Sequence, residues 1–318
     1  MQRCHTAWLV AIAIVASGCG SAAKPATSAN SQAEDTPARA SASGANAQTS
    51  PPTPKAPEGE PKQAARAPSK EDAEASPFEV VPVRGQRLPR ADNGTALTAP
   101  VDVYASMTEV YSNAELLVVA TDGVFDEAAM KSYLVTPLFD ALAERVEKAK
   151  GATTPGSPWD GRFVLAADAG LPFESLVSLL YTSARAGYRH FDFVVVNAAG
   201  QHRVVAVDPP KFAGLGTPVP IRFTIVISSQ DVHVRSEGKV VDTLPRSAAK
   251  ALDVDAIAEH ARAFVAAHPD SVATVTADDD VDFQAIISAI AALRGPDCRY
   301  PDPEGCILPA ITIEAGAG

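Results

Sequence analysis

The feature that most constrains the fold of this chain is an internal repeat. The segment FVLAADAGLPFESLVSLLYTSARAGYRHFDFVVVN, residues 163–197, has a counterpart in ATVTADDDVDFQAIISAIAALRG, residues 273–295. At a constant offset of 110, each has a short apolar strand that ends in Ala-Asp and a helix that begins with Phe: Asp168 with Phe173, and Asp278 with Phe283. Both helices carry a stripe of apolar residues on one face. The shared pattern predicts a duplication.

The similarity extends on both sides of these segments. Before each strand the periodicity predicts another amphipathic helix, and before that helix a hairpin with alternating polarity. A closing strand follows each second helix. Each copy therefore reads β-β-α-β-α-β, an α+β fold in which a small mixed sheet carries two helices on one face. The predicted elements are hairpins over 101–112 and 222–236, helices over 136–150 and 253–268, and closing strands over 191–196 and 308–313.

The N-terminus has the features of an export signal. AWLVAIAIVASG, residues 7–18, is an apolar run that is too short to span a bilayer, which takes about 20 residues. It ends in ASGC, which resembles a bacterial lipobox and predicts lipidation of Cys19, although Ala16 replaces the usual leucine. The alternative is an ordinary cleaved signal with an incidental cysteine.

Composition separates a tether from a folded body. We predict a lipoprotein signal over 1–19 and a disordered linker over 20–95, which is rich in Ala, Pro and Ser and cannot bury enough surface to fold. The first repeat domain is expected over 96–200 and the second over 221–316. The stretch 201–220 contains several Gly and Pro residues and is predicted to connect them.

The charge distribution excludes one class of partner. Residues 91–318 hold 17 basic and 30 acidic side chains, so this part carries a formal charge of −13. An acidic body without a basic stripe argues against nucleic acid and against docking on anionic lipid head groups. A polyanionic partner would have to meet a local patch.

Two cysteines remain in the body, Cys298 and Cys306, eight residues apart. In an oxidising compartment they are expected to form a disulfide that closes a small loop. A structural zinc site is the alternative, but it normally takes four Cys or His ligands.

The sequence contains no assembled catalytic motif. Asp168 and Asp278 stand where an active-site acid could lie at the end of a strand, but an acid there also satisfies turn and helix-start amides, and we favour that structural role. The acidic run over 278–282 lacks the spacing of a calcium loop. Trp159 is interpreted as a loop anchor rather than a sugar-stacking ring. No metal or cofactor is predicted.

Each repeat resembles the periplasmic domain of the ExbD/TolR family. The resemblance lies in the order of a strand, Ala-Asp, Pro-Phe or Asp-Phe, an apolar helix and a closing strand. The resemblance covers roughly 100–197 and 222–315, and it makes Asp168, Phe173, Asp278 and Phe283 family-motif positions. Members of that family belong to proton-driven motors for biopolymer transport and work as dimers. They carry an acidic residue in a membrane helix, and the apolar run of this chain has none.

The resemblance implies a non-enzymatic envelope protein. It would be anchored by lipid and face the periplasm, with the outer membrane favoured because Gly20 rather than aspartate follows the cysteine. Its two domains would form an internal pseudo-dimer. They would bind motor or transport proteins as an adaptor; peptidoglycan is the alternative ligand, and an enzyme with Asp168 or Asp278 as the acid is a third hypothesis.

Overall fold

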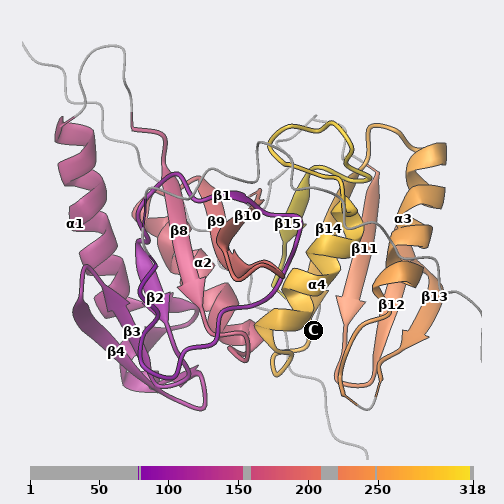
Figure 1. Cartoon of the computed structure of the whole chain (residues 1–318). Helices are drawn as coiled ribbons and strands as arrows, with labels where there is room; N and C mark the ends of the chain where they lie inside the picture. The colour runs from indigo at the N-terminus through magenta and orange to yellow at the C-terminus, as the bar shows by residue number, and fades with distance from the viewer. Residues whose placement is uncertain (1–77, 79, 153–158, 209–220, 248, 316–318) are drawn as a thin grey trace, which may run out of the picture. The chain divides into compact units, whose positions relative to one another are not determined.

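A computed structural model describes residues 78, 80–152, 159–208, 221–247 and 249–315. The predicted signal, Cys19 and most of the predicted linker lie outside these residues. The described residues belong to one compact unit that contains both repeats (Figure 1). In the described part of the chain, no helix is both long and apolar enough to cross a membrane.

The first repeat follows the predicted order and adds one strand. Its parallel pairs β2–β8 and β8–β9 continue into antiparallel β2–β3 and β3–β4. Its elements are β2 (Val103–Ala105), β3 (Glu109–Ser112), β4 (Glu115–Thr121), α1 (Thr136–Ala152), β8 (Arg162–Ala167), α2 (Phe173–Ala186) and β9 (His190–Val196).

The second repeat has the same topology. The strand order β15-β14-β11-β12-β13 matches β9-β8-β2-β3-β4 of the first repeat, with the same parallel and antiparallel pairs. The α+β class with a mixed sheet in each repeat is thus confirmed. The elements are β11 (Arg222–Ile227), β12 (Asp231–Ser236), β13 (Lys239–Pro245), α3 (Val254–Ala267), β14 (Val272–Ala277), α4 (Phe283–Arg294) and β15 (Ile311–Ile313).

The predicted β-β-α-β-α-β order lacked one strand that both repeats share, since a third hairpin strand, β4 or β13, follows the first two in each repeat. The extra strands, β4 and β13, do not alternate cleanly between buried and exposed residues. A bulge shifts the register beside each of them, between Val110 and Tyr111 and between Val234 and Arg235. A shift of this kind breaks the period of two by which a strand is found in a sequence.

Matching hydrogen bonds show how far the repetition goes. In the first hairpin, Ser106 N donates to Glu109 O at 2.8 Å and the Ser106 hydroxyl accepts from Glu109 N at 2.9 Å. In the second, Ser228 N donates to Asp231 O at 2.9 Å and its hydroxyl accepts from Asp231 N at 2.9 Å. The same serine turn therefore closes both hairpins.

Additional strands extend the first sheet only. β10 (His202–Val207) pairs with β9 along its whole length, and β1 (Thr95–Ala96) pairs with β10. β10 lies in the stretch that we predicted as a connector, so the sheet continues to residue 207. Smaller elements are β5 (Val124–Phe125), a 3-10 helix (Glu127–Ala129), and the hairpin of β6 (Met130–Lys131) and β7 (Leu134–Val135).

The four described α-helices bury one face of the two sheets in a shared core, whose largest fully buried members are Phe163, Phe173, Phe193, Phe223 and Phe283. Burial of side chains of this size contributes roughly 1.5–3 kcal/mol each.

The opposite face of the first sheet is covered by residues 80–101, which we call the strap. Val80 and Leu97 of the strap are buried against Val164, Ala166 and Val194. The packed body thus begins ahead of residue 96, where we expected the first domain to start. The corresponding β14 positions hold Thr274 and Thr276, so only the first repeat offers the strap an apolar face.

Candidate functional site

The two copies of the family-like motif meet each other. Residue Pro172, before α2, forms an antiparallel bridge with Asp282, before α4. Phe173 N donates to Val281 O at 2.8 Å, and Phe283 N donates to Leu171 O at 2.9 Å. The offset of 110 maps each of these bonds onto the other, so the two loops pair about a local two-fold axis.

A second pair of bonds repeats the symmetry. Glu174 N donates to Asp279 O at 3.2 Å, and Gln284 N donates to Ala169 O at 2.8 Å. The first backbone amides of both helices, which have no partner within a helix, are thus satisfied by the other repeat. Contacts of this self-complementary kind are typical of two-fold dimers. We call the paired loops, residues 169–174 and 279–284, the seam.

The two motif phenylalanines are buried behind the seam. Phe173 and Phe283 are both 0% exposed. The ring of Phe283, in the second repeat, meets the ring of Phe193, in the first, edge to face with centroids 5.1 Å apart. Phe283 is therefore a packing residue that joins the two repeats.

The two motif aspartates have different surroundings. Asp168 is 1% exposed; one carboxylate oxygen accepts from the strap amide Arg87 N at 2.7 Å and the other from Gly170 N at 2.8 Å. Asp278 is exposed. Only backbone bonds are common to both. Asp168 N donates to Ala105 O and Asp278 N to Ile227 O, while Asp168 O accepts from Leu171 N and Asp278 O from Val281 N. The difference arises because the strap crosses only the first repeat.

We expect Asp168→Asn to lower the free energy of unfolding by about 2 kcal/mol, because an amide nitrogen would face one of two buried N–H donors. Asp278→Asn is expected to change it by less than about 0.5 kcal/mol. Urea unfolding followed by circular dichroism measures both. Equal effects of the two substitutions would contradict the environments described above.

The acidic run after β14 acts as a helix cap. The carboxylate of Asp282 accepts from Ala285 N at 2.8 Å at the start of α4. Within the described ranges, no three His, Cys, Asp or Glu side chains lie close enough together to hold a metal ion.

Two buried acids in the first repeat were not predicted. Asp102 accepts from Val164 N at 2.7 Å and pairs with Arg145 at 2.9 Å, yet burial raises the pKa of its carboxyl to about 6. Burial also raises the pKa of Asp192, although Arg162 lies against it. Neither residue has a sequence signal beyond its place at an end of a strand. Both link strands to neighbouring elements, away from the seam.

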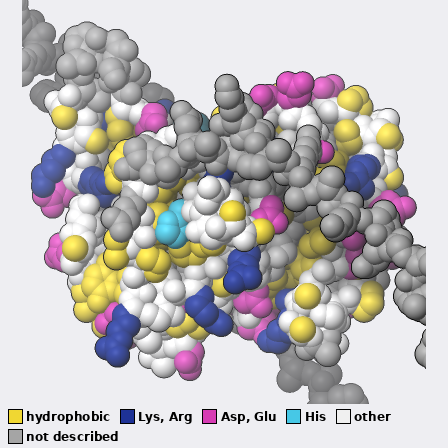
Figure 2. Space-filling model, viewed as in Figure 1, with side chains coloured by type: hydrophobic (Ala, Val, Ile, Leu, Met, Phe, Trp, Pro, Cys, Tyr) yellow, Lys and Arg dark blue, Asp and Glu magenta, His cyan; other side chains and the backbone are white. Residues whose placement is uncertain are grey.

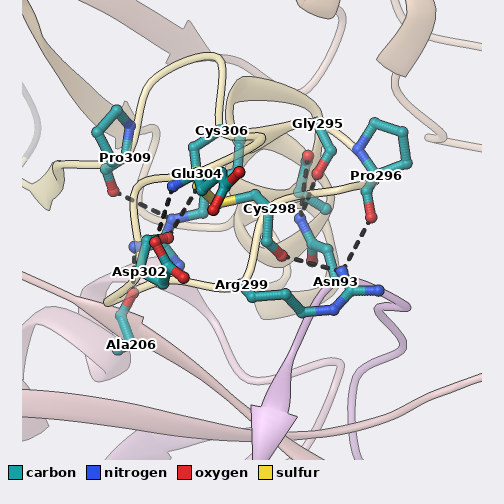
Figure 3. The surroundings of a disulfide bond; sticks show 12 residues. Asn93, Ala206, Gly295, Pro296, Cys298, Arg299, Asp302, Glu304, Cys306 and Pro309 are labelled. Carbon is teal, nitrogen blue, oxygen red and sulfur yellow. Dashed lines mark hydrogen bonds between the residues drawn. A yellow bond between two sulfur atoms is a disulfide. The ribbon is translucent and has the colours of Figure 1, made fainter. Parts of the chain in front are cut away.

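A second contact between the repeats surrounds the disulfide (Figure 3). Cys298 and Cys306 are bonded, with Cα atoms 4.3 Å apart, which confirms the predicted disulfide. From the strap, Asn93 donates to Ala291 O at 3.2 Å and to Gly295 O at 3.3 Å. We interpret the disulfide loop as structural because it supports this contact.

Arg294, at the end of α4, is buried in the same region. Its guanidinium donates to Ala206 O of β10 and to Pro309 O, and it lies over the Tyr300 ring at 4.4 Å. Burial lowers the pKa of Arg294 to about 10. Trp159 also has a packing role, since its ring contacts Tyr188 with centroids 5.4 Å apart.

A cleft of about 810 Å³ opens beside the seam. The strap supplies Arg87, Leu88 and Arg90, the segment before α3 supplies residues 249–252, and α3 supplies its first residue, Val254. Lining residues also come from the seam and from the first turns of α4, including Gln284 and Ser288. Sequence reasoning missed this cleft. The one available signal was RGQRLPR, residues 84–90, which holds three arginines in a stretch interpreted as linker.

Fold and seam together define a duplicated α+β protein whose halves pair as two subunits of a dimer would. Comparison with protein-family models, with curated proteins and with solved structures finds no match. The functional argument therefore depends on the chain's own residues.

Proposed function

We propose that this chain is a non-enzymatic lipoprotein of the bacterial envelope. Lipid on Cys19 would anchor it, the segment after it would act as a tether, and the two repeats would bind a protein of a Ton/Tol-type, ExbD-related transport or motor system. The chain would be an accessory without the proton-carrying membrane helix. We place it facing the periplasm and favour the outer membrane, on the sequence around Cys19.

The observation that carries this proposal is the pairing of the two motif loops. ExbD/TolR-type domains work as dimers, and here the four seam bonds give two covalently linked copies the symmetry of a dimer. The repeated strand–turn–helix motif thus supplies both the resemblance and the contact. One chain would present the surface that two subunits otherwise build.

The surroundings of the two aspartates support a binding role rather than catalysis. Both carboxylate oxygens of Asp168 are occupied by backbone amides. Asp278 accepts no side-chain hydrogen bond and forms no ion pair with any residue in the described ranges. A general acid normally acts with a second polar group within hydrogen-bonding reach.

An edge strand offers one surface for a partner. β13 is the outer strand of the second sheet, and its Val240 and Val241 are 52% and 55% exposed. An extended segment of a partner can add to such an edge through main-chain hydrogen bonds. The register shift and Pro245 limit the length that could pair.

Peptidoglycan binding is the second candidate, favoured by the basic cleft on an otherwise acidic body. Purified sacculi incubated with the chain distinguish the two functions. If the chain sediments with sacculi, and added envelope extract does not change the amount, the result would support peptidoglycan binding. If the chain is absent from the pellet, the adaptor function would be favoured.

The adaptor function is tested by photo-crosslinking in intact cells. With a benzophenone amino acid at position 241 we expect adducts that contain motor or transport subunits. The same probe at Arg189, exposed in the first repeat, is the matched control and is expected to give few adducts. Adducts with wall fragments alone, or identical adducts at both positions, would contradict the proposal.

A further inference from the structure

The cleft beside the seam carries a concentration of positive charge that the body as a whole lacks. Arg87 and Arg90 come from the strap and Lys250 from the second repeat. All three are exposed, and none forms an ion pair with a residue in the parts of the chain that the structure describes. Figure 2 shows Lys and Arg side chains near the middle of the displayed face, next to hydrophobic and acidic side chains.

The one acid that lines the cleft does not neutralise these cations. One oxygen of Asp282 accepts from Ala285 N, and the other lies 4.0 Å from the guanidinium of Arg246, whose side chain is 2% exposed. The α4 amides at 283 and 284 are used in the seam. The three exposed cations are therefore left to act on a ligand.

The strap is fixed where it enters the cleft. Arg90 N donates to the side-chain oxygen of Gln284 at 2.8 Å, and the Gln284 amide donates back to Arg90 O at 3.1 Å. This two-point contact holds the Arg90 backbone, so less conformational entropy is lost when a ligand binds its side chain. Gln284 is thus a positioning residue.

The rest of the lining indicates the kind of ligand. Leu88, Val196, Leu252 and Val254 give the cleft apolar walls, and none of the described residues that line it has an aromatic ring on which a sugar could stack. Its volume of about 810 Å³ lies within the range of small-molecule and short-peptide sites. Arginine pairs well with carboxylates, and the apolar walls suit aliphatic side chains next to them.

We propose that this cleft binds an extended acidic peptide in which carboxylates alternate with aliphatic side chains. Arg87, from the strap, and Lys250, from the second repeat, would pair with the carboxylates, and Leu88 and Leu252 would contact the aliphatic groups. The inference depends on the cleft alone. It can hold if the link to a transport system fails, because it names a ligand chemistry rather than a partner.

The test uses the full chain, purified in detergent, and the fluorescein-labelled peptide Leu-Glu-Leu-Glu-Leu-Glu. Fluorescence anisotropy is expected to show saturable binding that weakens several-fold between about 50 and about 500 mM NaCl. The double variant Arg87→Gln, Lys250→Gln is expected to bind at least about 30-fold more weakly, since two charge-assisted contacts are lost. The charge-matched control Arg189→Gln, Lys239→Gln alters two exposed cations outside the cleft and is expected to stay within about 2-fold.

Four results would overturn the proposal: no binding of the peptide, equal weakening by both double variants, equal binding of a Ser-Glu repeat, and displacement of the peptide by inorganic phosphate or soluble wall muropeptides at low concentration. Thermal unfolding checks that each variant is folded. If the Arg87 substitution disturbs the strap, the single variant Lys250→Gln tests the site. Its affinity for the peptide is expected to fall by about 5-fold or more. A weaker effect there would count against the site.

Discussion

Phe283→Ala is expected to lower the free energy of unfolding by about 3–5 kcal/mol, the largest effect of any substitution considered in this chain. The ring is 0% exposed and meets Phe193 of the other repeat at 5.1 Å. Its removal leaves a cavity at the point where the repeats join and also removes an edge-to-face contact. Urea unfolding followed by circular dichroism, extrapolated to water, measures the change.

The matched control is Tyr181→Ala. Tyr181 is also an aromatic residue of a motif helix, but it is 44% exposed and meets only Tyr133, with centroids 6.4 Å apart. We expect a loss of about 1 kcal/mol or less. If both variants lose the same stability, Phe283 does not have the burial described here. If Phe283→Ala loses less than about 1.5 kcal/mol, the junction between the repeats is not a packed core.

The local parts of the fold could be predicted because their signals lie within one element. The stripes on the two motif helices and the two cysteines act over a few residues. The offset of 110 then made each repeat a check on the other. Such agreement between independent local signals is what makes an assignment dependable.

The parts that escaped prediction depend on contacts between distant residues. Residues 80–95 of the strap were interpreted as linker because the stretch 20–95 is rich in Ala, Pro and Ser. They are ordered by the apolar face of β8 and β9. The cleft joins Arg87 and Arg90 to Lys250, about 160 residues later, and no local pattern relates them. The seam bonds are backbone to backbone, so side-chain identity does not encode them.

The strap explains why the two repeats have different surroundings. It covers the apolar face of the first sheet, supplies the amide that binds Asp168 and brings two arginines to the cleft. The second repeat has threonines at the matching β14 positions and an exposed Asp278. The repetition thus gives the two loops that pair in the seam. The strap makes the surroundings of these loops unequal, and it creates a cleft that a symmetric dimer would not have.

Acidification is expected to stabilise the first repeat through Asp102. Burial raises the pKa of this carboxyl from 3.8 to about 6, more than the nearby Arg145 lowers it. The folded state therefore holds the proton more tightly than the unfolded state. The resulting stabilisation amounts to about 3 kcal/mol, at about 1.4 kcal/mol for each unit by which the pKa is raised. It is fully present below about pH 4 and is lost as the pH rises through about 6.

Urea unfolding at pH values of about 7.5, about 6 and about 5 measures the effect. When the pH is lowered from about 7.5 to about 5, Asp102 alone is expected to add about 1.4 kcal/mol to the free energy of unfolding. Asp102→Asn keeps an oxygen that can accept from Val164 N but cannot titrate, so its stability should rise by that much less over the same interval. Asp140→Asn, at an exposed position of α1, is the control and should follow the unaltered chain.

The raised pKa of Asp192 acts in the same direction in all three proteins and cancels from the comparison. Equal pH dependence of the unaltered chain and Asp102→Asn would show that the carboxyl is not held in a buried, proton-binding environment.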